Sequence, residues 1–146
     1  MRRYVVDASV AIKWFFQTAG DEDDLEPAVA LLRANRDGEI LFCQPPHFMA
    51  EVAAVLARKK PPDEARADVN DLLNLDLQGV ESTAVYMTAC DFAIRLNHHL
   101  FDTLYHAVAL HTTGATLITA DRRYFDKACA LGQIARLDDL NWLLPP

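Results

Sequence analysis

Short hydrophobic runs alternate along the chain with longer stretches in which hydrophobic residues recur every three or four positions. Four runs predict buried strands: 4–9, 39–46, 115–119 and 133–137. Six longer stretches predict helices: 9–16, 25–38, 47–60, 63–75, 85–100 and 102–113. Because strands that alternate with helices form parallel sheets covered by helices, the pattern predicts an α/β fold with a central, mainly parallel sheet.

Two of the predicted strands are followed closely by an aspartate. Asp7 ends the first hydrophobic run, in YVVDAS, and Asp121 follows the strand 115–119, in LITADRRYF. Aspartate is depleted in strands, so each acid is either a turn residue or a site residue, and either one alone fits both explanations. Open parallel sheets bind their ligands beyond the carboxyl ends of the strands. We therefore expect both side chains at one edge of the sheet.

Two further acids lie on predicted helices. Glu51 is at the flank of the apolar face of helix 47–60, where an ion pair with Arg58 explains it as well as a site does. Asp102 begins helix 102–113, and for this residue alone an N-cap role is the better explanation.

The four acids together favour a metal site, because each stands where it can face one point. Two unit charges about 4 Å apart repel by roughly 4 kcal/mol at an effective dielectric constant of 20. Grouped carboxylates therefore require raised pKa values or a bound cation. Because all the donors are oxygens, we expect Mg²⁺ or Mn²⁺ rather than zinc.

A histidine-containing metal site is the alternative to this interpretation. His98, Asp102 and His106 recur every four residues, which is the helical spacing of metal ligands. Since Asp102 is predicted to begin its helix, His98 is expected on the preceding turn, away from that face. His98 and His99 are therefore expected to be exposed residues at a helix end.

Length, composition and charge indicate what kind of protein this is. With 146 residues, 51% of them hydrophobic, the chain is expected to form one domain over residues 1–146. Three scattered cysteines, no leader pattern and no membrane-length apolar run favour a cytoplasmic protein that does not enter a membrane. The net charge of −7 argues against a protein that coats nucleic acid. It does not exclude a nuclease whose acids gather at a metal site.

Four segments resemble the acidic motifs of PIN domains, and most of all those of VapC-like toxins: VVDASVAIKW, PPHFMAEVAAVL, FDTLYHAVAL and LITADRRYF. Each motif is weak alone, but the ordered set, from Tyr4 to about Leu137, is specific. The resemblance implies a three-layer α/β/α sandwich and a Mg²⁺-dependent endoribonuclease, with Mn²⁺ as the alternative ion. The residues it implies as catalytic and metal-binding are Asp7, Glu51, Asp102 and Asp121, supported by Ser9 and Thr119.

The resemblance also implies partners: an RNA substrate, a cognate antitoxin that blocks the acidic site, and a second copy in a homodimer. Growth arrest by RNA cleavage would be the cellular role, and a catalytically silent PIN-like binding module is the alternative.

Trp14, Phe15 and Phe16 are too widely spread around one helix to share a single buried stripe. Either a partner or packing between two layers would accommodate them. The candidates for RNA binding are Arg58, Lys59, Arg122 and Arg123.

Overall fold

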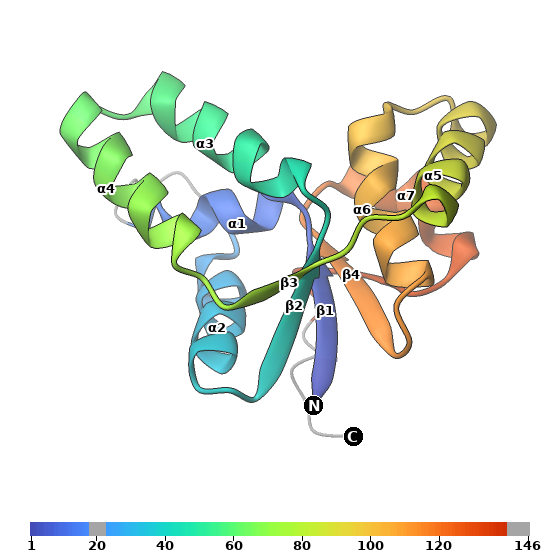
Figure 1. Ribbon diagram of the computed structural model, residues 1–146, viewed down its shortest axis with the longest axis horizontal. Coiled ribbons are helices and arrows are strands. Elements are labelled where there is room, and N and C mark those ends of the chain that lie inside the picture. Colours follow the sequence, from blue (N-terminus) through green and yellow to red (C-terminus); the bar gives the residue numbers. More distant parts are fainter. Residues whose placement is uncertain (18–22, 140–146) are drawn as a thin grey trace.

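The computed structural model describes residues 1–17 and 23–139 and contains a five-stranded sheet (Figure 1). The strands are β1 (Arg2–Val6), β2 (Ile40–Gln44), β3 (Leu77–Gly79), β4 (Ala115–Thr119) and β5 (Ile134–Arg136). Their order is β3-β2-β1-β4-β5, and every neighbouring pair is parallel. The predicted parallel α/β sandwich is therefore confirmed. The sequence pattern did not predict β3, which has three residues, ends in glycine and is largely exposed.

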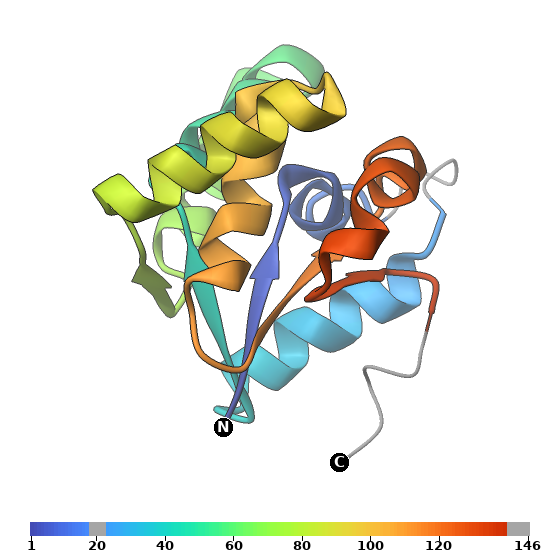
Figure 2. The same ribbon diagram turned by 90° about the vertical axis from the view of Figure 1, so that its right-hand side faces the viewer.

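Helices cover both faces of the sheet. They are α1 (Ala8–Trp14), α2 (Leu25–Arg36), α3 (His47–Lys59), α4 (Pro62–Leu73), α5 (Thr83–Leu96), α6 (Leu100–Leu110) and α7 (Arg122–Ala128). Figure 2 shows α1 and α2 on one face and α5 and α6 on the other. None of the helices in the described part of the chain has the length and apolar character needed to cross a membrane. The polar, acidic segment 17–24 lies mostly outside the described residues.

The strand order reverses beside β1. The chain runs from β1 to β2 and β3 on one side, and then crosses over to β4 and β5 on the other. Such a reversal opens a crevice at the carboxyl ends of the two strands that flank it. Val6, the last residue of β1, pairs with Ile118 of β4, so Asp7 and Asp121 both follow strands at this crevice.

Helix α6 is the most buried helix, because residues 103–109 are all buried. A helix that is apolar on all sides is expected to lie in the interior. It packs against β1, β2 and β4 and leads directly into β4. Its first turn, which carries Asp102, therefore lies at the carboxyl ends of the strands.

The aromatic residues at the end of α1 and just beyond it pack against the rest of the fold. The indole N–H of Trp14 donates to the carbonyl oxygen of Ala28 at 2.8 Å, and its ring stacks on Phe42 with 5.5 Å between centroids. Lys60 places its ammonium 4.8 Å from the centre of the Phe16 ring. Packing between layers therefore accounts for Trp14, and its burial requires no partner.

Candidate functional site

Asp7 is held by hydroxyl groups from two directions. Its Oδ1 accepts a hydrogen bond from Ser9, and its Oδ2 accepts one from Thr119. The two hydroxyl groups are themselves fixed by backbone amides. Ala120 N–H donates to Ser9 Oγ at 3.1 Å, and Asp121 N–H donates to Thr119 Oγ1 at 3.0 Å. The end of β4 thus orients the carboxylate that follows β1.

The surroundings of Asp7 favour a bound cation. Burial raises the pKa of Asp7 to about 6, although the hydrogen bonds from Ser9 and Thr119 oppose this rise. The negative charges of Asp102 and Asp121 raise the pKa further. Carboxylates that repel one another in a partly buried site are stabilised by a positive ion, so the donor set fits a hard divalent metal.

Asp121 combines a structural contact with its position at the site. Its Oδ1 accepts a hydrogen bond from the backbone N–H of Tyr124 at 3.1 Å, which caps the beginning of α7. The cap uses one carboxylate oxygen and fixes the side chain. The turn and site explanations that the sequence left open are therefore compatible.

Asp102 does not cap its helix, and the predicted N-cap role is wrong. Helix α6 begins at Leu100, with His99 in the N-cap position, so Asp102 is the third residue of the helix. The cause lies in the preceding connection. Asn97, the residue after α5, adopts a left-handed conformation with φ of 47°, so only residues 97–99 separate the two helices. The side chain of Asp102 is left free to face the crevice.

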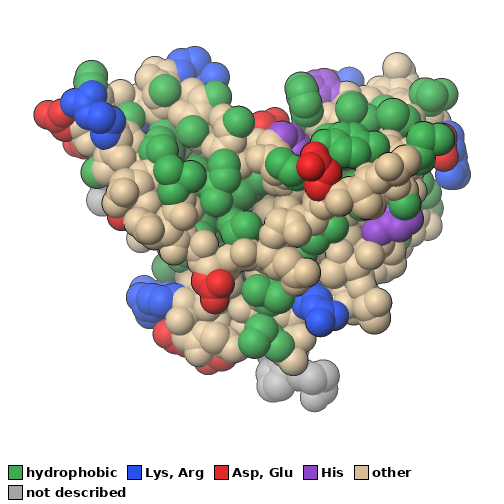
Figure 3. Space-filling view, viewed as in Figure 1, with side chains coloured by type: hydrophobic (Ala, Val, Ile, Leu, Met, Phe, Trp, Pro, Cys, Tyr) green, Lys and Arg blue, Asp and Glu red, His purple; other side chains and the backbone are tan. Residues whose placement is uncertain are grey.

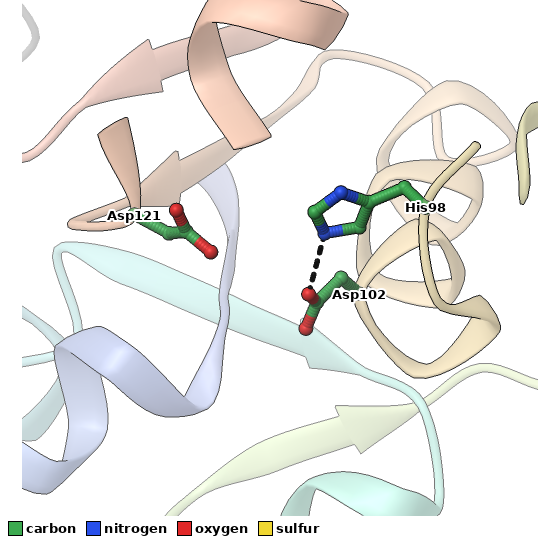
Figure 4. Close-up of side chains that lie close together, drawn as sticks. All are labelled: His98, Asp102 and Asp121. Atoms are coloured by element: carbon green, nitrogen blue, oxygen red, sulfur yellow. Dashed lines mark hydrogen bonds and ion pairs between the residues drawn. The ribbon is translucent and has the colours of Figure 1, made fainter. Parts of the chain in front are cut away.

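The structure also corrects the prediction for His98. Its Nε2 lies 2.7 Å from Asp102 Oδ2, and its side chain is only 10% exposed. His98, Asp102 and Asp121 each offer a donor atom, and these atoms lie within 4.8 Å of one another (Figure 4). The chain turns back after Asn97 and brings the imidazole over the first turn of α6. His99 is exposed, as predicted.

His106 is a buried structural residue. Its Nδ1 lies 2.9 Å from the hydroxyl of Tyr124, and its Nε2 lies 2.8 Å from the carbonyl oxygen of Gly132. Burial lowers the pKa of His106, although its hydrogen bond to Gly132 opposes this effect. Both ring nitrogens have hydrogen-bond partners in the core. His106 is therefore not available as a metal ligand, although its spacing from Asp102 would suit one.

Glu51 faces α6 and is not paired with Arg58. The Tyr105 hydroxyl donates to Glu51 Oε1 at 2.6 Å, and His47 Nε2 lies 3.3 Å from the same oxygen. Partial burial opposes ionisation, but the hydrogen bonds from His47 and Tyr105 outweigh it and lower the pKa of Glu51. Burial raises the pKa of Tyr105, as do its hydrogen bond to Glu51 and the charges of Glu51, Asp7 and Asp102. Tyr105 therefore holds Glu51 by a hydrogen bond and lies within electrostatic range of Asp7 and Asp102.

The candidate RNA-binding residues are exposed on the surface. Arg122 forms an ion pair with Asp138 at 2.9 Å, while Arg123 is exposed beside it. Arg58 and Lys59 are exposed in the last turn of α3. Their part in RNA binding stays a prediction.

The surface is hollowed between two groups of helices. Figure 3 shows a depression between the α3–α4 side and the α5–α6 side of the molecule, with hydrophobic side chains on its walls. Acidic and histidine side chains appear near its bottom. The Asp102 side chain is 37% exposed, so this carboxylate can be reached from outside.

Sequence reasoning missed Tyr105 and the contact between His98 and Asp102. Tyr105 follows Asp102 by three residues, which places both side chains on neighbouring parts of one helix face. A buried tyrosine hydroxyl normally requires a partner, so Tyr105 was a recognisable candidate. The His98 contact depends on the tight connection after Asn97, which the pattern of apolar residues did not show.

Known proteins with this fold provide the comparison. A family profile described as the PIN domain matches residues 4–131. VapBC2 from Rickettsia felis, solved with a promoter DNA fragment, is 14% identical with a TM-score of 0.66, covering 92% of this chain and 98% of that one. VapC20 from Mycobacterium tuberculosis, a Sarcin-Ricin loop cleaving toxin, is 18% identical with a TM-score of 0.61, and the alignment covers 87% of this chain and 94% of that one.

DNA-bound VapBC from Salmonella typhimurium is 12% identical with a TM-score of 0.63, and the alignment covers 94% of this chain and 99% of that one. Identities this low establish a shared fold alone. Among curated proteins, no sequence matches significantly. The family profile spans most of the chain, and its match includes all four acids. The chain belongs to the PIN domain family.

Proposed function

We propose that the protein is a metal-dependent endoribonuclease that hydrolyses RNA phosphodiester bonds. The observation that carries this proposal is the placement of Asp102 and Asp121 beside Asp7 at the crevice: the donor atoms of Asp102 and Asp121 lie within 4.8 Å of each other, and their charges add to burial in raising the pKa of Asp7. Membership of the PIN domain family supports the same conclusion. Glu51 completes the catalytic and metal-binding set.

The four carboxylates would hold Mg²⁺, or Mn²⁺ in its place. When bound, such an ion lowers the pKa of a coordinated water and stabilises charge on the leaving oxygen. The protein contributes fixed ligand positions. Ser9 and Thr119 orient Asp7, and the first turn of α7 orients Asp121. Attack of water on the phosphorus, with departure of the 3′-oxygen, would need no histidine as a general base and would leave products that carry a 5′-phosphate and a 3′-hydroxyl.

The substrate would enter the depression above the acids. Exposed basic residues are suited to the RNA backbone, because phosphate contacts position a nucleic acid without reading its sequence. The residues proposed for this role are Arg58, Lys59, Arg122 and Arg123. The net charge of −7 does not oppose it, since part of that charge would be neutralised by the bound metal.

A toxin role in a toxin–antitoxin pair is the proposed cellular function, exerted in the cytoplasm by arresting growth through RNA cleavage. Structures of similar fold include VapBC complexes, which supports a cognate antitoxin as the partner. We propose that residues 1–146 act as one PIN-like domain within a homodimer. An antitoxin seated over the acidic site should abolish cleavage in a stoichiometric complex.

The proposal is tested with purified, antitoxin-free protein and end-labelled cellular RNA, in Mg²⁺ or in EDTA. Discrete fragments should form only with the metal, and both Asp7→Asn and Asp121→Asn should abolish them. Asp126→Asn is the matched control, because Asp126 is an exposed acid of α7. Folded protein that binds Mn²⁺ and RNA but cleaves none would favour the silent binding module. Cleavage that survives EDTA and both substitutions would contradict the proposed active site.

A further inference from the structure

A chain of side-chain hydrogen bonds connects α7 to the carboxylate of Asp102. The ammonium group of Lys127 lies 3.3 Å from His98 Nδ1, and His98 Nε2 lies 2.7 Å from Asp102 Oδ2. Lys127 also donates to the carbonyl oxygen of Asn97 at 3.1 Å. This contact anchors Lys127 to the connection between α5 and α6.

The donor in each contact follows from the chemistry of lysine. A lysine ammonium can only donate, so His98 Nδ1 must accept. The hydrogen of the neutral imidazole is then on Nε2, which donates to Asp102 Oδ2. The ring is fixed from the side as well, because Tyr124 packs edge-on against it with 4.9 Å between centroids. Both the orientation and the tautomer of His98 are thus determined.

We propose that His98 and Lys127 are positioning residues that hold the Asp102 carboxylate for metal binding. His98 engages Oδ2 through its Nε2–H group and leaves Oδ1 for the cation. An Nε2 that donates this hydrogen has no lone pair for a metal, so His98 is not itself a ligand. The inference rests on the proposed function, and it adds two residues outside the four acids and their hydroxyl supports.

The proposal gives α7 a second role. Asp121 caps the first turn of this helix, and Lys127 is in its last turn. One short helix thereby fixes two of the carboxylates, Asp121 through its cap and Asp102 through His98. Removing hydrogen-bond partners of metal ligands typically weakens metal affinity about 10- to 100-fold, which is the effect expected here.

The test measures the dissociation constant for Mn²⁺ by electron paramagnetic resonance, without RNA. His98→Ala should weaken binding about 10- to 100-fold. His98→Gln should restore most of the affinity, because its amide can donate to Asp102. His111→Ala is the matched control, since His111 is at the opposite end of α6 and contacts Thr88.

Lys127→Met separates this proposal from simple electrostatics. Loss of a positive charge near a cation site should strengthen Mn²⁺ binding by charge alone. The proposed positioning role predicts weaker Mn²⁺ binding, because His98 would lose the partner that fixes its tautomer. Tighter or unchanged binding in Lys127→Met would overturn the proposal.

Nitrogen coupling in the spectrum of bound Mn²⁺ provides a second criterion. No directly coordinated nitrogen should be lost in His98→Ala, and a loss would make His98 a ligand and overturn the proposal. Unchanged affinity in His98→Ala, or wild-type protein that binds no Mn²⁺, would also overturn it. If His98→Ala does not fold, as judged by circular dichroism, His98→Gln and Lys127→Met decide the outcome. Wild-type protein that binds Mn²⁺ without cleaving RNA would contradict the proposed function alone.

Discussion

Gln44, the last residue of β2, forms both of its side-chain hydrogen bonds with the backbone of Val6, the last residue of β1. Its Oε1 accepts from Val6 N–H at 2.8 Å, and its Nε2 donates to Val6 O at 2.7 Å. The side chain takes the place of a backbone partner at the carboxyl end of the strand pair. Because Asp7 comes next in the chain, Gln44 fixes the backbone from which the central acid projects.

Gln44→Leu should lower the free energy of unfolding by about 2–4 kcal/mol, because two buried backbone groups would lose their partners. Urea unfolding measures the effect. Gln78→Leu is the control, since Gln78 is exposed in β3 and should lose little stability. Equal losses in the two variants would show that the Gln44 hydrogen bonds do not stabilise the fold.

Asp7→Asn should stabilise the metal-free protein at alkaline pH. Folding raises the pKa of Asp7 from 3.8 to about 6, so the folded state binds more protons between these values and loses stability as pH rises through them. The variant lacks this loss, and at pH 8 it should be more stable by at most roughly 3 kcal/mol. At pH 3 the two proteins should have similar stability.

Thermal unfolding in EDTA at both pH values measures this difference. Mg²⁺ should then stabilise the wild-type protein more than Asp7→Asn, because the variant lacks a ligand charge. A stability difference that is the same at pH 3 and pH 8 would contradict the raised pKa of Asp7.

Tyr105→Phe should raise the pKa of Glu51, because a carboxylate that loses a hydrogen-bond donor becomes harder to ionise. NMR titration of the Glu51 carboxyl carbon gives the pKa directly. His47→Ala should act in the same direction, since His47 contacts the same oxygen. An unchanged pKa in Tyr105→Phe would mean that the phenol does not stabilise the Glu51 carboxylate.

Asp102→Asn should not destabilise the protein, because Asp102 does not cap α6 and its charge repels Asp7. Ser82→Ala is the informative comparison. Ser82 caps α5 by accepting from Val85 N–H at 3.2 Å, and its loss should cost about 1 kcal/mol. Guanidinium unfolding compares the two variants. A larger loss in Asp102→Asn than in Ser82→Ala would restore the capping role to Asp102.

The parts of the site that follow strands were predictable from the sequence. β1 and β4 contain short apolar runs, and the positions of Asp7 and Asp121 follow from where those runs end. The start of α6 was not predictable in this way, because it depends on the left-handed conformation of Asn97. Capping preference suggested Asp102 as the first residue, while the tight connection placed the start at Leu100.

Side-chain contacts between segments that are far apart in the sequence are the other feature of the site that could not be predicted. The partners of Gln44, Tyr105 and His98 come from strands and helices that the chain brings together only in the folded state. A polar residue in an apolar segment indicates that some partner exists, but its spacing along the sequence does not identify the partner.

The chemical ends of the RNA fragments test the central claim most directly. Water attack promoted by a metal held between the four carboxylates predicts 5′-phosphate and 3′-hydroxyl ends, formed with Mg²⁺ by the wild-type protein and absent with Asp7→Asn. Fragments with 2′,3′-cyclic phosphate and 5′-hydroxyl ends, formed equally in EDTA, would contradict the account. Such products arise when the ribose 2′-hydroxyl of the RNA attacks the phosphorus. The proposed metal site would instead direct a water molecule to the phosphorus.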